Sequence, residues 1–408
     1  MTKRQEKLLI AMCWLLYVSA YLGRYSYTTN ILPISNFYNV EKDVVSLATT
    51  FFFFAYGAGQ IINGLLCRFY KVKYVLSGAL IASAVINLSI FLGLPFEYIK
   101  YMWLLNGVVQ SVLWSSLLMC LSKNLDENYI KKAIIAMSTT ASVGTFLAYG
   151  LSALLAVWGA FKFSFLVGAL VMIVSAVLWI ILYDGITKPT QDNKSEQVEQ
   201  VAQEKCVQKK KIDGTVVSTL IIFGVVAVII NLMKDGLSTW VPNILSERYK
   251  VSDSLSILLT LILPVLAIFG TTFVVTLNKK IKEHAFLIAI VFGIASVLIG
   301  AVILLFKTPF WGIVLGAFGL VSLLMSGANN VVTSMIPLGL RDKANSGFIA
   351  GILNGCCYVG STLSQFGLAV IATSHGWSVV FDLMFICGLV IVAIGAICGI
   401  IRGLKRSK

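Results

Sequence analysis

The sequence predicts an all-α membrane protein that crosses the bilayer with twelve helices. Three observations lead to this prediction. Of the 408 residues, 58% are hydrophobic and only 12% are charged. Apolar runs of about 18 or more residues, long enough to span a bilayer as a helix, recur along the whole chain. Lys and Arg collect in alternate loops. A transmembrane β-barrel would instead show short segments of alternating polarity.

The apolar runs define the expected helices in order. They lie near residues 8–33, 45–67, 74–95, 101–123, 132–157, 161–183, 215–246, 254–277, 285–306, 309–336, 345–373 and 377–401. A polar stretch at 184–214, rich in Lys, Gln and Glu, separates the sixth span from the seventh. Such a segment without apolar periodicity is typical of a linker. We therefore expect an N-terminal six-helix bundle at 1–183, a cytoplasmic linker, and a C-terminal six-helix bundle at 215–408.

The basic residues orient this arrangement in the membrane. With the N-terminus in the cytoplasm, 24 of the 32 Lys and Arg residues fall on the cytoplasmic side and six on the other side. The positive-inside rule then places both termini in the cytoplasm. The formal net charge of +14 is explained by this topology, so we expect the lipid bilayer as a partner and no nucleic acid.

Two cations, Arg24 and Lys234, lie deep inside expected spans. A charge at such a position costs roughly 2.5–3.5 kcal/mol on insertion scales and marks a functional site by default. Arg24 is followed by Pro33 and Lys234 by Pro242 at similar distances, which indicates an internal repeat. Transporters built from such repeats bind substrate near the midplane, between the repeats. The pair therefore predicts a binding site for a small anion.

Polar and aromatic residues at helical spacing accompany these cations. They are Tyr17 and Tyr21 with Arg24, Tyr56 with Gln60, Gln110 with Trp114, and Asn354 with Tyr358. Residues three, four or seven apart share one face of a helix and can line a common cavity. Asp235 adjoins Lys234 but projects about 100° away around an ideal helix. We therefore expect that it need not pair with Lys234, and that the empty site holds two unpaired cations.

The sequence offers no sign of catalysis. None of the eight cysteines belongs to a CxxC pair, and no Ser/His/Asp constellation or cluster of metal ligands is apparent. We expect no metal, no cofactor and no enzymatic activity.

At these residues the chain resembles the organophosphate:phosphate antiporters of the major facilitator superfamily, the family of the glycerol-3-phosphate and hexose-phosphate transporters. The matching segments are Tyr21-Leu-Gly-Arg24, Asn106-Gly-Val-Val-Gln110 with Trp114, Trp240-Val-Pro242 after Lys234, the small-residue stretch Ser346–Gly360, and Gly376-Trp377. The resemblance covers nearly the whole length. It implies the major facilitator fold and a phosphate held between Arg24 and Lys234.

The resemblance also implies a set of lining residues. They are Tyr17, Tyr21, Tyr56, Trp114 and Tyr358, and Gln60 occupies a position where the best-known members carry a lysine. Further departures are Lys234 in place of an arginine, Ala141 in place of a histidine, and Asn231 in place of a tyrosine. This site is less positive than those of the best-known members, which leaves room for a less highly charged organic anion.

Three functions are open at this point. The first is exchange of a phosphate ester for inorganic phosphate. The second is proton-coupled symport of an organic acid, with Asp235 as the coupling group because burial raises the pKa of a carboxyl. The third is a membrane sensor that transports nothing. We expect a monomer in a cell membrane, with a bacterial plasma membrane as the default location.

Overall fold

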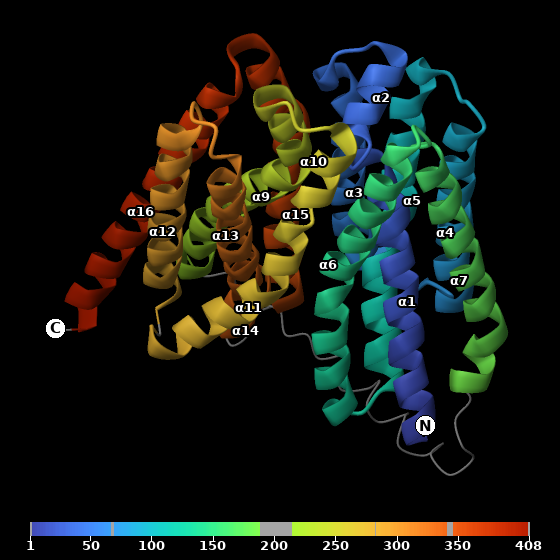
Figure 1. Cartoon of the computed structure of the whole chain (residues 1–408). Coiled ribbons are helices and arrows are strands. Elements are labelled where there is room, and N and C mark those ends of the chain that lie inside the picture. The colour runs from blue at the N-terminus through green and yellow to red at the C-terminus, as the bar shows by residue number, and fades with distance from the viewer. Residues whose placement is uncertain (1, 67–68, 188–213, 282, 341–345, 407–408) are drawn as a thin grey trace.

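The computed structural model describes residues 2–66, 69–187, 214–281, 283–340 and 346–406, and every regular element in these ranges is helical (Figure 1). The first group of helices comprises α1 (Lys3–Thr28), α2 (Ile31–Tyr38), α3 (Lys42–Leu66), α4 (Val72–Phe91), α5 (Phe96–Asn124), α6 (Glu127–Val157) and α7 (Phe163–Thr187). The second comprises α9 (Gly214–Tyr249), α10 (Asp253–Thr260), α11 (Ile262–Lys280), α12 (His284–Leu305), α13 (Trp311–Asn330), the π-helix η3 (Val331–Met335), α14 (Ile336–Gly339), α15 (Ser346–His375) and α16 (Trp377–Arg406).

Twelve segments of this chain are long and apolar enough to cross a membrane, as the sequence predicts. The sixth expected span ends at residue 183, whereas the corresponding helix, α7, continues to Thr187. Most of the expected linker, residues 188–213, lies outside the described residues. The division into bundles at 1–183 and 215–408 stays a prediction.

Prolines break two of the expected spans. The first span is two helices, α1 and α2, with the break at Thr29 and Asn30. Pro33 explains the break, because a proline ring clashes with the carbonyl four residues earlier and tolerates only the first turn of a helix. Pro264 separates α10 from α11 in the same way.

Pro242 is different, because α9 continues through it. A proline has no N–H, so the carbonyl of Ser238, four residues earlier, lacks its usual helical donor. The hydroxyl of Tyr149 on α6 donates to that carbonyl instead. The carbonyl that lacks a donor within α9 thus accepts a hydrogen bond from the other group of helices.

The packing of the helices repeats along the chain. In the first group α1 packs on α6, α3 on α5, and α4 on α7. In the second group α9 packs on α15, α11 on α13, and α12 on α16, which is the same pattern in the same order. The groups meet through α3 with α15 and through α6 with α10 and α11, so each contributes the corresponding helices to the seam. Figure 1 shows this seam between α6 and the yellow helices.

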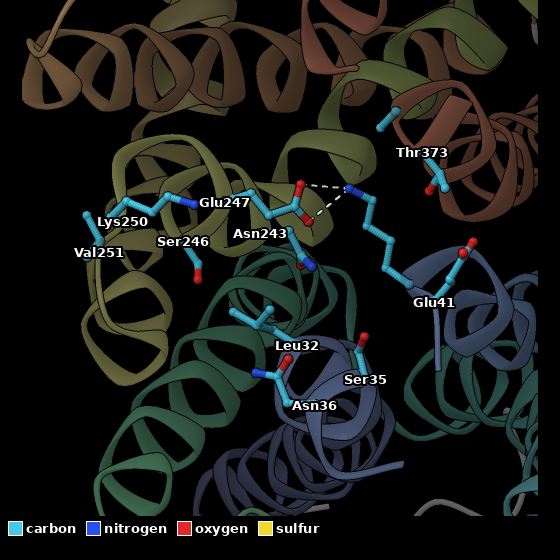
Figure 2. Close-up of a pocket in the computed structure, with 12 residues that line it drawn as sticks. Leu32, Ser35, Asn36, Glu41, Asn243, Ser246, Glu247, Lys250, Val251 and Thr373 are labelled. Carbon is cyan, nitrogen blue, oxygen red and sulfur yellow. Dashed lines mark hydrogen bonds and ion pairs between the residues drawn. The ribbon is translucent and has the colours of Figure 1, made fainter. Parts of the chain in front are cut away.

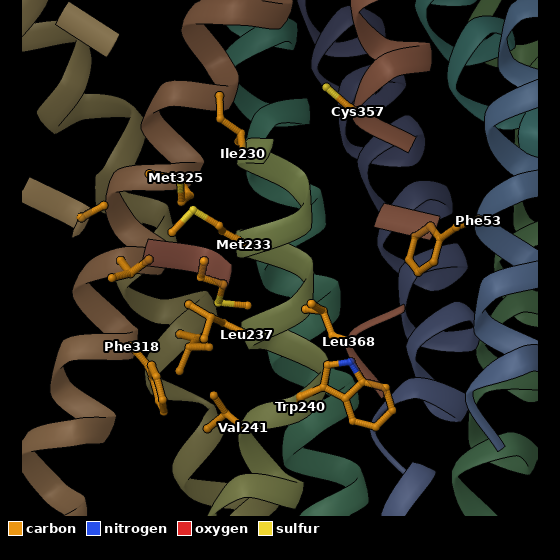
Figure 3. Packing of buried hydrophobic residues seen from close by; sticks show 14 of the residues in the cluster. Phe53, Ile230, Met233, Leu237, Trp240, Val241, Phe318, Met325, Cys357 and Leu368 are labelled. Atoms are coloured by element: carbon orange, nitrogen blue, oxygen red, sulfur yellow. The ribbon is translucent and has the colours of Figure 1, made fainter. Parts of the chain in front are cut away.

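Part of the core of the second group lies between α9 and α13. Ile230, Met233, Leu237 and Val241 recur at helical spacing on α9 and are at most 1% exposed. Figure 3 shows them on the side of α9 toward Phe318 and Met325 of α13. This apolar contact fixes the rotation of α9 and therefore the direction in which its polar residues project.

Polar contacts join the two groups at one end, where the loops after α2, α9 and α15 gather. We call it the outer end because the topology predicts that it faces away from the cytoplasm. Lys42 of α3 bonds both carboxylate oxygens of Glu247 on α9, at 2.8 and 2.7 Å (Figure 2). The Trp377 indole donates to the same carboxylate at 2.8 Å. Asn36 of α2 donates to Asp253 of α10 at 2.8 Å. These bonds hold the outer end together in this structure.

Candidate substrate-binding site

Arg24 lies on α1 inside an aromatic cage and is 3% exposed. Its guanidinium carbon is 4.3 Å from the ring centroid of Tyr56, 4.6 Å from that of Tyr21 and 5.1 Å from that of Phe52. Aromatic faces attract cations at such distances, and more strongly where water is excluded. The rings therefore stabilise a charge that has no carboxylate within ion-pair distance among the described residues.

Hydrogen bonds fix one edge of the Arg24 guanidinium and leave another edge unbonded. The Nε atom donates to Oε1 of Gln110 on α5 at 3.0 Å. Gln110 is itself held by its Nε2, which donates to Ser83 at 2.8 Å. The Nη2 atom of Arg24 is buried and has no hydrogen-bond partner in the described structure. An unsatisfied buried donor of a charged group costs on the order of 1–3 kcal/mol or more, so this atom favours the binding of an anion.

The remaining aromatic residues form a continuous row from α1 to α15. The hydroxyls of Tyr17 and Tyr56 lie 3.1 Å apart, and Trp114 packs 5.0 Å from Tyr17 between ring centroids. Tyr358 of α15 packs 4.8 Å from Tyr56. Gly57 permits this approach, since a Cβ there would lie 2.6 Å from the Cβ of Tyr358. The structure therefore brings the five predicted aromatic residues into one cluster beside Arg24, and one of them comes from the second group of helices.

Gln60 lies one turn from Tyr56 on α3. Its Nε2 donates to the backbone carbonyl of Ser111 on α5 at 3.2 Å, and the residue is 9% exposed. It is thus engaged in packing α3 against α5. Its predicted contact with a substrate stays a prediction.

Lys234 differs from Arg24 in having a carboxylate partner. Its Nζ lies 3.3 Å from Oδ1 of Asp235, and Ser361 of α15 donates to Oδ2 of Asp235 at 2.5 Å. The expectation that Asp235 need not pair with Lys234 is therefore wrong. The reason is physical: the side chains of neighbouring residues diverge at Cβ, but the flexible four-carbon stem of lysine can turn back to its neighbour. Of the two cations, Arg24 alone lacks a counter-charge among the described residues.

Lys234 lies on the face of α9 that meets the first group of helices. Ser238 is one turn further along this face, and its carbonyl accepts from Tyr149 of α6. Tyr21 of α1 lies within electrostatic range of both Arg24 and Lys234. The two cations therefore flank one region of the seam, each contributed by a different group of helices.

Sequence reasoning missed several contributors to this region. Phe52 looks like an ordinary apolar residue of its helix. Gln110 stands out only in the motif with Asn106 and Trp114, and Ser361 only as one of many small residues on α15. Each becomes identifiable through contacts between helices that a single sequence does not specify.

A polar pocket lies away from these cations, at the outer end, and has a volume of about 770 Å³ (Figure 2). Glu41, Lys42, Glu247 and Lys250 line it together with Asn243. Its two basic and two acidic residues balance, so it has no net preference for an anion. Within the described ranges, no group of three or more His, Cys, Asp or Glu side chains is placed to hold a metal.

Known proteins resemble this chain over most of its length. The Sugar phosphate exchanger 3 proteins of Xenopus laevis and Gallus gallus are each 22% identical to it, over 83% and 85% of this chain and 75% and 77% of the relatives. Among solved structures, an inward-facing, occupied bacterial homolog of the human lysosomal transporter Spinster aligns with a TM-score of 0.70 and 14% identity, covering 97% of this chain and 96% of that chain. The D-xylose-proton symporter aligns with a TM-score of 0.69 and 14% identity, covering 97% of each chain.

These structures share the fold of this chain, and its twelve apolar helices make it a multi-pass membrane protein. Residues 13–365 match the Major Facilitator Superfamily. The chain therefore belongs to the major facilitator superfamily, and it is a membrane transporter rather than an enzyme.

Proposed function

We propose that this transporter exchanges a phosphate ester for inorganic phosphate, with the phosphoryl group bound between Arg24 and Lys234. The observation that carries the proposal is the buried, unbonded Nη2 of Arg24 beside its aromatic cage. A guanidinium offers a planar fork that suits phosphate oxygens, and an ammonium adds a compact second charge. The names of the two Sugar phosphate exchanger 3 relatives support the same class of substrate.

Exchange follows from the cost of an empty site. Without a ligand, closing the seam around Arg24 removes water from an uncompensated cation, which is unfavourable. A bound phosphate supplies the missing acceptors and neutralises the charge. The two groups of helices can then rock past each other, as in alternating access, which requires the bonds at the outer end to break and re-form.

The test is counterflow in proteoliposomes that contain the purified protein. We expect uptake of labelled phosphate to be fast when the vesicles hold unlabelled phosphate and slow when they hold none. Uptake that does not depend on internal phosphate would overturn exchange. Arg248→Ala is a matched control for Arg24→Ala, because Arg248 donates to the backbone carbonyls of Phe306 and Lys307 at the outer end, away from the proposed site.

A second candidate is proton-coupled symport of an organic anion, and the contact between Lys234 and Asp235 favours it. While Asp235 is ionised it competes with the substrate for the Lys234 ammonium. A proton on Asp235 removes that competition, so the proton and the anion would bind together. Asp235→Asn distinguishes the two functions: symport predicts loss of uptake driven by a pH gradient, and exchange predicts that counterflow persists.

A further inference from the structure

A third polar residue, Asn329, lies beside Lys234 and takes no part in the proposed phosphate clasp. It is the penultimate residue of α13, two residues before the start of the π-helix η3. π-helical turns are rare and occur often at functional sites. Asn329 is partly exposed, whereas Val331 and Val332, which follow it, are fully buried.

Two hydrogen bonds determine which end of the Asn329 amide is available. Its Oδ1 accepts from Nδ2 of Asn231 at 2.9 Å and from Sγ of Cys357 at 3.4 Å. The orientation of Asn231 is fixed in turn, since its Nδ2 also donates to the carbonyl of Ala227 at 2.9 Å. A carbonyl accepts only from a donor, so Asn329 must present its oxygen to Asn231. Its Nδ2, with two N–H groups, donates to no side chain or carbonyl of the described residues and is the available end.

This amide bonds Asn231, which precedes Lys234 by one turn of α9. Asn231 and Lys234 are three residues apart on α9 and therefore lie near each other on its surface. Cys357 lies within electrostatic range of Lys234. Asn329 therefore lies in the neighbourhood of the cation, on a third helix, α13.

The two sides of Lys234 have different chemistry. Toward the outer end lies the carboxylate of Asp235 with its bond from Ser361. Toward the other end lie Asn231, Asn329 and Cys357, which are neutral and polar. A neutral donor next to a phosphate-binding cation suits the uncharged part of a phosphate ester, where hydroxyl oxygens accept hydrogen bonds.

We propose that Asn329 is a specificity-determining residue, whose Nδ2 donates to a hydroxyl oxygen in the organic part of the substrate. This inference rests on the proposed function and narrows its substrate to a hydroxylated phosphate ester. Inorganic phosphate, which lacks that part, binds without Asn329.

Three ligands separate the phosphate contact from the hydroxyl contact: inorganic phosphate, methyl phosphate and glycerol phosphate. We measure their dissociation constants on the purified, full-length protein. Asn329→Ala should weaken glycerol phosphate about 3- to 10-fold, the range expected for one neutral hydrogen bond. The constants for inorganic phosphate and methyl phosphate should stay within about twofold. Ser322→Ala, on the same helix but bonded to the carbonyl of Leu263, should leave all three unchanged.

The outcome is a ratio of constants, so it does not depend on the fraction of active protein. If Asn329→Ala yields too little folded protein, Asn329→Ser carries the same comparison, because a hydroxyl can still accept from Asn231. An equal loss for all three ligands would show that Asn329 only supports the fold, and no loss would show that it does not touch the substrate; either result overturns the inference and leaves the proposed function standing. A wild-type protein that binds none of the three overturns both.

Discussion

Arg24 and Lys234 occupy matching places in the two repeats, yet their surroundings differ. Arg24 is enclosed by rings, fixed by Gln110 at 3.0 Å, and has a free buried donor. Lys234 is more open, and its ammonium lies 3.3 Å from the carboxylate of its own neighbour. The two repeats thus share the position of a cation but differ in its neighbour: Lys234 has a carboxylate within ion-pair distance and Arg24 has none among the described residues. An anion can therefore bind Arg24 without a competitor, whereas it must compete with Asp235 for Lys234.

The largest effect should come from Arg24→Ala. Loss of one partner from a buried, hydrogen-bonded charge pair costs roughly 2–5 kcal/mol, so we expect phosphate affinity to fall by at least about 30-fold. Arg24→Lys should recover little, because an ammonium does not reproduce the planar fork. Isothermal titration with inorganic phosphate measures both variants. Affinity near that of the wild type in Arg24→Ala would contradict the clasp.

Lys234→Ala should have a smaller effect on binding, because the wild-type ammonium already shares its charge with Asp235. We expect about a 10-fold loss of phosphate affinity, together with a lower melting temperature, since the carboxylate is left without its cation. The double variant Lys234→Ala, Asp235→Asn should recover the melting temperature but not the affinity. If it recovers both, Lys234 serves only to neutralise Asp235.

Asp235→Asn should change phosphate affinity in the opposite direction. Removal of the competing carboxylate should strengthen phosphate binding, by about 3- to 10-fold if the pair is worth the 0.5–1.5 kcal/mol of a typical hydrogen bond. Titration at one fixed pH gives the change. Weaker binding in this variant would mean that Asp235 positions Lys234 for the substrate instead of competing for it.

The smallest effect should come from the ion pair at the outer end, where Glu247 is 38% exposed in its side chain. Such pairs contribute about 0–1 kcal/mol, so Lys42→Gln should change the apparent phosphate affinity less than about fivefold. The exchanged pair Lys42→Glu, Glu247→Lys should lie closer to the wild type than either single variant. Labelling of a cysteine introduced at Asn243, in the outer pocket, would report whether the outer end opens more often.

The sequence predicts the fold well because hydropathy and charge act over whole segments. The twelve spans are confirmed, and the helical spacing of Tyr17, Tyr21 and Arg24 correctly places them on one face. Hydropathy and charge do not predict which residues of different helices come into contact. Nothing in the periodicity of α13 indicates that Asn329 meets Asn231, because the register between helices is set by packing across the whole core.

Local geometry also misleads where side chains are long. An ideal helix separates Lys234 from Asp235 by about 100°, and that angle alone suggests that they do not meet. The lysine stem is long enough to overcome it. The breaks at Pro33 and Pro264 follow from the chemistry of proline, yet the hydropathy of each span gives no sign of them.

The hydrogen bond between Tyr149 and the carbonyl of Ser238 gives Pro242 a role in the proposed transport cycle. Pro242 withholds the amide that this oxygen would otherwise receive, and a side chain across the seam replaces it. The proposed exchange requires the two groups of helices to separate at the outer end. The Ser238 carbonyl would then have to be hydrated or lose its hydrogen bond in a medium where unpaired carbonyls are costly. In the proposed mechanism, opening of the outer end and entry of water to the Ser238 carbonyl would therefore occur together.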